Sequence, residues 1–205
     1  ALSGGTVYTA PHWLSGAQLR RLRDATAAFA TSSDAASSTR RYASRGVHAR
    51  AIDLLAEGVW PRLPPPLLEL VGGLDKLRTE LAIASGRAFL DILELQLLSY
   101  ERGGQYARHL DTGGESDQAS PVRRSVSFLL YLTPDDWGPS DGGQLRVYEG
   151  PDSLQADVVP GPGTFVMFDS ASVPHEVLAT RRKRLAVVGW LLQRREESPR
   201  VTIVD

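Results

Sequence analysis

The chain has 205 residues, no cysteine and a formal net charge of −1 at pH 7. This length suits one compact core, which at this size folds without the help of a metal or a disulfide. The balance of 23 Lys+Arg against 24 Asp+Glu argues against non-specific nucleic-acid binding, and the lack of cysteine excludes disulfides, thiolate metal sites and cysteine nucleophiles. No apolar run reaches the length of a membrane span, so we expect a soluble, cytoplasmic protein with no nucleic-acid and no membrane partner.

The first third of the chain has a helical pattern. Apolar residues recur at helical spacing after Ser15, which is a suitable N-cap. They are Leu19, Leu22, Ala25 and Phe29. A second helix is predicted for residues 67–85, with an interruption at Gly72–Gly73 left open and a stop at Gly86. Residues 31–44, rich in Ser, Ala and Asp, are predicted to form a mobile loop.

From residue 90 onward the pattern changes to short β runs separated by turn residues. The predicted strands cover residues 92–100, 105–109, 125–132, 144–148, 157–159, 164–168, 176–178 and 184–192. About eight such strands favour a sandwich, a barrel or a jelly roll. The turn sequences at 141–143 and 161–163 favour hairpin-like connections and therefore a mostly antiparallel sheet. We expect one domain over residues 1–205, with helices and loops in 1–90 supporting a β core in 91–195.

The tripeptide His109-Leu110-Asp111 is the first candidate for chemistry. Residues i and i+2 of a strand project to the same face, so an imidazole and a carboxylate could reach one ion, although an ordinary surface pair would look the same. His175 is the third candidate, because His12 and His48 lie in the helical or loop-rich part. Two histidines and one carboxylate on a β scaffold match the facial triad of non-haem Fe(II) oxygenases. A structural zinc site would need a fourth ligand, for which the sequence offers no comparable candidate.

Arg184 could anchor an anionic co-substrate. Its guanidinium can grip a carboxylate with two parallel hydrogen bonds and stays charged at any working pH. The alternative is a solvated turn, because Arg184 ends the basic run of residues 181–184. Strand alternation places Arg184 on one face with Ala186, Val188 and Trp190, which favours a pocket.

Several motifs follow one another between residues 95 and 192. They are YERGGQY (100–106), ARHLD (107–111), Arg124, YL (131–132), DW (136–137), DGGQL (141–145), PGPG (160–163) before Phe168, PHEV (174–177), Thr180, Arg184 and Trp190. In this order they resemble the catalytic domain of the iron(II)- and 2-oxoglutarate-dependent dioxygenases, specifically the prolyl 4-hydroxylase group. The PHEV and DGGQL motifs are most similar to those of the oxygen-sensing prolyl hydroxylases and their bacterial relatives.

The resemblance implies a mainly β fold, a double-stranded β-helix (jelly roll) with supporting N-terminal helices packed on one sheet. It implies Fe(II), 2-oxoglutarate and O2 as cofactors, with ascorbate as a further one. The implied Fe(II) ligands are His109, Asp111 and His175. The implied 2-oxoglutarate contacts are Arg184 and Tyr131 for the distal carboxylate, with Tyr100 and Trp190 beside them. Val188 stands where some of these enzymes place a hydroxyl-bearing residue, so that contact would be absent.

The resemblance also implies the substrate side of the site. Tyr106 and Trp190 would line the iron pocket and Arg124 would face the substrate entrance. The implied reaction is hydroxylation of an unactivated C–H bond, with a prolyl residue of a peptide or protein as the substrate. Residues 1–90 would shape substrate choice, and the loops 31–44 and 112–121 could close over the substrate as lids.

Other functions remain open at this point. A free amino acid or a peptide natural product could replace the prolyl substrate, whereas oxidative demethylation of nucleic acid is disfavoured by the neutral charge. A non-catalytic jelly-roll module that binds a small molecule or a protein is the alternative from another class. Ser125 or Ser127 could join a catalytic triad, but without a G-x-S-x-G elbow both are interpreted as ordinary strand residues.

Overall fold

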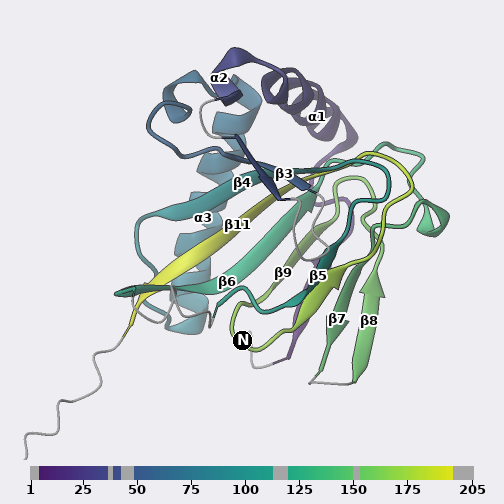
Figure 1. The fold of residues 1–205 in the computed structure, drawn as a ribbon. Helices are drawn as coiled ribbons and strands as arrows, with labels where there is room; N and C mark the ends of the chain where they lie inside the picture. Colours follow the sequence, from purple (N-terminus) through teal and green to yellow (C-terminus); the bar gives the residue numbers. More distant parts are fainter. Residues whose placement is uncertain (1–4, 37–38, 43–48, 113–119, 150–152, 196–205) are drawn as a thin grey trace, which may run out of the picture.

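The computed structural model describes residues 5–36, 39–42, 49–112, 120–149 and 153–195. Within this part of the chain two antiparallel sheets lie face to face, with helices on the outer face of the larger one (Figure 1). In spatial order the seven-stranded sheet contains β1 (Val7–Ala10), β9 (Phe165–Asp169), β6 (Val122–Tyr131), β11 (Arg184–Arg194), β4 (Leu93–Tyr100), β3 (Ala49–Asp53) and β2 (Thr39–Tyr42). The four-stranded sheet contains β5 (Tyr106–His109), β10 (His175–Val177), β7 (Leu145–Tyr148) and β8 (Leu154–Val158). This is the expected mainly β jelly roll with N-terminal helices.

The helices begin and end for local chemical reasons. Helix α1 (Gly16–Ala30) starts after Ser15, whose hydroxyl accepts from the backbone N–H of Gln18 in a capping box. Helix α3 (Pro65–Ser85) runs without a break through Gly72–Gly73 and stops at Gly86, which has a φ of 70°. Helix α2 (Ser33–Ala36) is a single turn, and 3₁₀ turns cover Trp60–Arg62 and Pro139–Asp141. No helix in the described ranges combines the length and the apolar character that a bilayer span needs.

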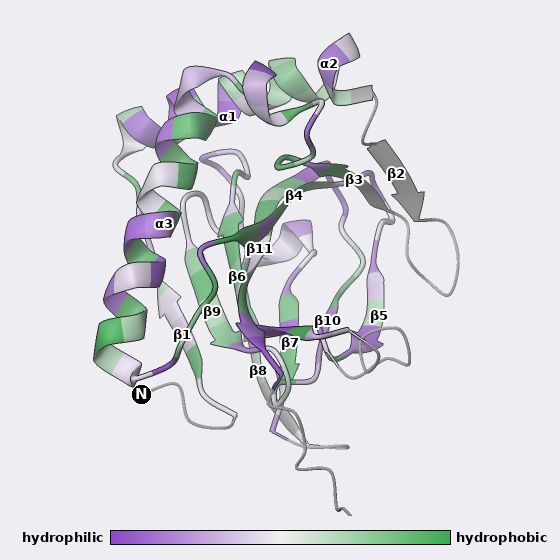
Figure 2. Cartoon of the chain, turned by 90° about the vertical axis from the view of Figure 1, so that its left-hand side faces the viewer, coloured by the Kyte–Doolittle hydropathy of each residue, from purple (hydrophilic) through white to green (hydrophobic). Residues whose placement is uncertain are grey.

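The large sheet lies between the helices and the small sheet (Figure 2). Its two faces belong to two separate apolar clusters. Along β6, Phe128 and Leu130 pack in the outer layer with residues of α1 and α3, whereas Leu129 and Tyr131 pack in the inner layer between the sheets. This alternation follows from the two-residue period of a strand. Because both faces are covered, most of β6 and β11 is buried, and a polar side chain on the inner face lies away from water.

Two expectations for the N-terminal region were wrong in part. Residues 1–90 were expected to hold only helices and loops, yet β1, β2 and β3 belong to the large sheet. The expected loop 31–44 contains α2 and β2. The physical reason is that these short strands are defined by hydrogen bonding to partners, β1 with β9 and β3 with β4, and not by their own composition. Residues 37–38, 43–44 and 113–119 of the two expected loops lie outside the described residues.

Candidate metal centre

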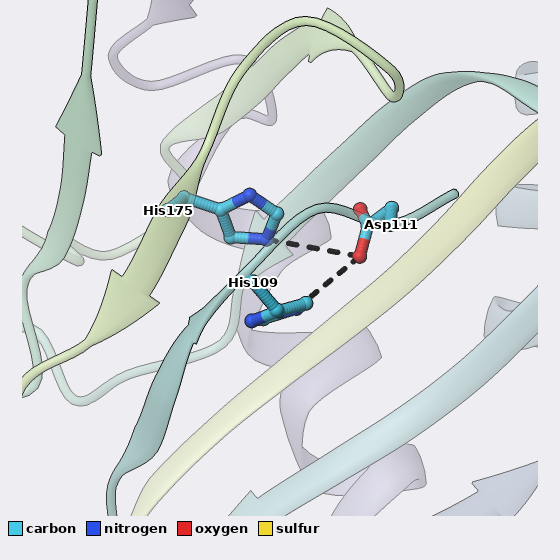
Figure 3. Close-up of side chains that lie close together, drawn as sticks. All are labelled: His109, Asp111 and His175. Carbon is cyan, nitrogen blue, oxygen red and sulfur yellow. Dashed lines mark ion pairs between the residues drawn. The ribbon is translucent and has the colours of Figure 1, made fainter. Parts of the chain in front are cut away.

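Three side chains meet between the two sheets (Figure 3). His109 ends β5 and His175 begins β10, and the two are direct partners in the ladder of the small sheet. Asp111 lies two residues beyond His109, past the end of β5. One ligand atom from each of the three side chains lies within 4.8 Å of the other two. The structure therefore brings together the three residues for which the sequence predicts metal binding.

The hydrogen bonds of the two histidines show which nitrogen of each ring carries a hydrogen and which has a lone pair to offer. Nδ1 of His109 is 2.9 Å from the carbonyl oxygen of Ala107, and Nδ1 of His175 is 3.0 Å from that of Val173. A carbonyl only accepts, so each Nδ1 carries the hydrogen, and each Nε2 of a neutral imidazole presents a lone pair. These Nε2 atoms lie 3.3 and 3.7 Å from Oδ1 of Asp111.

Three acceptor atoms that converge without a hydrogen between them repel one another unless a proton or a cation lies among them. Two imidazole nitrogens and one carboxylate oxygen are the donor set of the facial triad, which suits Fe(II) and leaves coordination positions open. The donor set in this structure therefore fits such a metal.

The protonation states also suit a metal. Burial alone would raise the pKa of Asp111, but His175, His109 and the Ser127 hydroxyl together hold it well below its usual range. Burial lowers the pKa of His175, against the opposing effect of Asp111. Near neutral pH the site therefore holds a carboxylate and a neutral imidazole, the forms that bind metal ions.

The second oxygen of Asp111 faces the large sheet. Oδ2 accepts hydrogen bonds from Oγ of Ser127 at 2.5 Å and from Nε1 of Trp190 at 2.9 Å. Ser127 and Trp190 are direct cross-strand partners on β6 and β11. Sequence reasoning missed Ser127, which was interpreted as an ordinary strand residue. The signal that could have identified it is a hydroxyl on the inner face of an otherwise apolar strand, in line with Tyr131.

Arg184 lies at the other end of the same region and is completely buried. Its guanidinium carbon is 5.1 Å from the ring centre of Tyr100 and 4.8 Å from that of Tyr131. Among the described residues, none of its three side-chain nitrogens has a hydrogen-bond partner, and neither does the Tyr131 hydroxyl. A buried, unpaired cation is costly, so the arrangement calls for an anion that accepts from these groups. Burial raises the pKa of Tyr131 despite the nearby guanidinium, so the phenol keeps its hydrogen and can donate.

A cavity of about 170 Å³ joins the two ends. It is lined by the three candidate metal ligands, by Arg184, Tyr100, Tyr106, Arg124 and Trp190, and by apolar side chains that include Val188. Tyr131 does not line the cavity. It lies next to Arg184, which does. The sequence-predicted site residues therefore surround one space, apart from Tyr131, which lies behind it.

The glycine pair at 142–143 allows the backbone to pass close to Ala179 and to the side chain of Arg184. Both glycines have a positive φ, of 73° and 70°. A Cβ at Gly143 would lie 2.9 Å from Cδ of Arg184, and one at Gly142 would lie 2.4 Å from the carbonyl oxygen of Ala179. The glycines therefore let the backbone before β7 approach the buried arginine closely.

The two residues that the sequence predicts for the substrate side, Arg124 and Tyr106, both line the cavity. Arg124 lies 3.6 Å above the ring of Trp190, and its Nε donates to the carboxylate of Glu94 at 2.9 Å. Its charge is therefore already paired at the cavity wall, a feature that the sequence did not predict. The ring centre of Tyr106 is 4.2 Å from that of His109, beside the candidate metal.

Comparison with known proteins agrees with this geometry. Residues 95–192 match the model of the 2OG-Fe(II) oxygenase superfamily. A PKHD-type hydroxylase of Maricaulis maris is 30% identical over 136 residues, which cover 60% of this chain and 57% of that protein. The chain therefore spans less than two thirds of the length of this curated relative.

Solved structures extend the similarity to nearly the whole chain. A prolyl-4-hydroxylase of Pseudomonas putida superposes with a TM-score of 0.75 and 29% identity, over 95% of this chain and 94% of that one. A prolyl hydroxylase of Trichoplax adhaerens, in complex with a peptide fragment of the hypoxia inducible factor oxygen degradation domain, has the same fold. It superposes with a TM-score of 0.73 and 17% identity, over 91% of this chain and 83% of that one. Residues 95–192 of the chain are therefore similar to the 2OG-Fe(II) oxygenase superfamily, and nearly the whole chain has the fold of a prolyl-4-hydroxylase.

Proposed function

We propose that residues 1–205 form a single Fe(II)- and 2-oxoglutarate-dependent dioxygenase domain that hydroxylates a prolyl residue of a peptide or protein. One observation carries the proposal. Three convergent acceptor atoms and an unpartnered buried guanidinium lie around the same cavity, so one molecule could reach both a metal and a cation.

His109, Asp111 and His175 would hold Fe(II). When bound, Fe(II) supplies the redox chemistry that couples oxidative decarboxylation of 2-oxoglutarate by O2 to insertion of oxygen into a C–H bond, with ascorbate as an auxiliary cofactor. The chain keeps both imidazoles in the tautomer that presents Nε2, by the hydrogen bonds of Nδ1 to backbone carbonyls. It also keeps the Asp111 carboxylate ionised.

Arg184 would bind the distal carboxylate of 2-oxoglutarate. A guanidinium can donate two parallel hydrogen bonds to a carboxylate, and the Tyr131 hydroxyl beside it can donate a third. The ring of Tyr100 covers the guanidinium, so this contact would form away from water, where charge-assisted hydrogen bonds are strongest. Binding at both ends would fix the orientation of the co-substrate before O2 arrives.

The substrate would reach the metal past Tyr106, Leu110 and Arg124. Leu110 is 43% exposed and lines the cavity, so an apolar ring such as that of proline could pack against it. Peptide binding is supported by the Trichoplax adhaerens relative, whose structure contains a peptide fragment. A free amino acid or a peptide natural product is the alternative substrate.

The first test is a visible absorption titration with Fe(II) and then 2-oxoglutarate under strict anaerobic conditions. A charge-transfer band that needs both additions and is absent in His109→Ala would support bidentate chelation at this metal. No band from a folded wild-type protein would contradict the proposal and favour a binding module.

The second test addresses the substrate. Proline-containing peptides and free L-proline are incubated with Fe(II), 2-oxoglutarate and O2, and products are analysed by mass spectrometry. We expect one added oxygen atom on a prolyl residue of a peptide. If only free L-proline is oxidised, the proposed substrate is the free amino acid and not a peptide.

A further inference from the structure

Asp111 is the one candidate ligand that no strand holds. Both histidines sit in β strands that pair with each other, whereas Asp111 follows the end of β5. Its side chain is nevertheless only 8% exposed. Its position must therefore come from contacts with side chains of the opposite sheet, which include Nη1 of Arg124, 3.5 Å from the Asp111 carbonyl oxygen.

The contacts form a directed chain of hydrogen bonds. An ionised carboxylate only accepts, so the hydrogen of the Ser127 hydroxyl points to Oδ2 of Asp111. Oγ of Ser170 lies 2.8 Å from Oγ of Ser127. Because a serine has one hydroxyl hydrogen and that of Ser127 is already used, Ser170 must donate to Ser127. Both serines are fully buried, so water does not compete for these bonds.

The same oxygen has a second donor. The indole N–H of Trp190 reaches Oδ2 from β11, beside Ser127 on β6. Two donors on Oδ2 leave only Oδ1 directed at the histidine nitrogens. Carboxylates can bind metals through one or both oxygens, and a carboxylate free to rotate could use both.

We infer that Ser127, supported by Ser170, is a positioning residue that makes Asp111 a ligand through one oxygen and preorganises the metal site. Trp190 assists by its indole N–H. With Oδ2 held by these hydrogen bonds, Asp111 would present only Oδ1 to a metal. The inference rests on the proposed function only in requiring that a divalent metal binds at this site.

The test measures metal affinity without turnover. Mn(II) is titrated into metal-free protein, and free Mn(II) is quantified by its EPR signal in the absence of 2-oxoglutarate. Mutation of groups that orient metal ligands typically weakens metal binding by 10- to 100-fold. We expect a loss of roughly tenfold or more for Ser127→Ala and a smaller loss for Ser170→Ala.

A double variant separates positioning from a general structural effect. Because Ser170 acts through Ser127, the double variant Ser127→Ala/Ser170→Ala should have the same Mn(II) affinity as Ser127→Ala. If the two substitutions damaged the fold independently, their losses of affinity would add. Ser127→Thr, which restores a hydroxyl, should recover most of the affinity.

The matched control is Ser125→Ala, on the same strand. The Ser125 hydroxyl contacts Arg87 and Gln193 and no candidate metal ligand, so its loss should leave Mn(II) affinity unchanged. Trp190→Phe keeps the ring under Arg124 but removes the N–H, and should weaken Mn(II) binding.

The outcomes are distinct. Unchanged Mn(II) affinity in Ser127→Ala, or additive losses in the double variant, would overturn the positioning role and leave the proposed function standing. Failure of the wild-type protein to bind Mn(II) or Fe(II) would overturn both. Melting of each metal-free variant, followed by circular dichroism, shows whether a loss of affinity accompanies a loss of fold.

Discussion

At the scale of single residues, one end of the cavity requires a bound cation and the other end requires a bound anion. We call these the two electrostatic demands of the site. At one end, lone pairs of His109, Asp111 and His175 converge and require a cation. At the other end, Arg184 is a buried cation that requires an anion. Each demand is unfavourable in isolation and is relieved when a metal and a dicarboxylate bind together. In the proposed function, the binding energy of the co-substrate would therefore have its origin in groups that the folded chain leaves unsatisfied.

Replacing Arg184 tests this argument. In Arg184→Met the affinity of the Mn(II)-loaded protein for 2-oxoglutarate should fall by about 2–5 kcal/mol, or roughly 30-fold or more, because a charged partner in a desolvated pair is lost. The melting temperature of the ligand-free protein should not fall, because an unpaired buried charge has been replaced by an apolar side chain of similar length. Calorimetric titration and thermal melting give the two quantities.

The control for this experiment is Lys183→Met. Lys183 is the adjacent cation, but it is exposed, and within the described part of the chain its one ion pair is with Glu101 at 3.6 Å. Its replacement should change 2-oxoglutarate affinity little. If Arg184→Met and the wild-type protein bind 2-oxoglutarate with equal affinity, Arg184 does not contact the co-substrate.

His175 should make stability depend on pH. Its pKa is lowered from the ordinary 6.5, so below that pH the unfolded chain binds a proton that the native chain does not. The free energy of unfolding of the metal-free protein should therefore fall as pH drops below about 6.5. Asp111 contributes nothing to this window, because its pKa is lowered from 3.8 and the residue stays ionised in both states.

Chemical denaturation between pH 5 and 8 in the presence of a chelator measures this dependence. His175→Gln should flatten it between pH 5 and 7. His12→Asn serves as the control, since His12 is exposed and its positive φ is one that Asn tolerates. A pH dependence that is unchanged in His175→Gln would show that other groups cause it.

At the scale of elements, β6 and β11 each place one residue next to Asp111 and one residue at the Arg184 end of the site. β6 contributes Ser127 and Tyr131, and β11 contributes Trp190 and Arg184, with alternation placing all four on the inner face. Ser127 and Tyr131 lie about 13 Å apart along β6, and Trp190 and Arg184 lie about 20 Å apart along β11, so the strands separate the two ends of the site. Two central strands therefore determine the length of the site.

The turn before β7 should affect the anchor. In Gly143→Ala the new Cβ would lie 2.9 Å from Cδ of Arg184, so 2-oxoglutarate affinity should fall several-fold, and stability should fall by about 1–2 kcal/mol because of the positive φ. Gly86→Ala has the same φ of 70° but open space around its Cβ. It should lose similar stability and keep its affinity. Equal affinity of the two variants would show that the contact with Arg184 has no role in binding.

The sequence predicted the elements whose pattern is local. Ser15 and Gly86 bound the two long helices as expected, and each of the eight predicted strands has a counterpart. The strands β1, β2 and β3 were missed because pairing with distant segments defines them. The three candidate metal ligands could be identified because His is rare in this chain. Ser127 and the pairing of Arg124 with Glu94 depend on cross-strand neighbours that no local pattern reveals.

At the scale of the whole molecule, the candidate metal site lies between the two sheets and has residues held by each of them. His109 and His175 belong to the small sheet, and Asp111 is held by Ser127 and Trp190 of the large sheet. A metal bound to all three would link the sheets through coordination bonds. Separation of the sheets then requires loss of the metal, so its binding free energy adds to the stability of the fold.

Metal binding should therefore stabilise the whole chain. At a free Mn(II) concentration 100 times its dissociation constant, the gain should be about 2.7 kcal/mol, which for a chain of this size raises the melting temperature by about 5–10 °C. Melting is followed by circular dichroism with Mn(II) and then with an excess of chelator, which should reverse the shift. Asp111→Asn keeps the shape of the side chain but has no charge to bind the ion and should show no shift. If Mn(II) binds the wild-type protein and the melting temperature stays the same, the ion also binds the unfolded chain or lies outside this site, and the two sheets are not connected by it.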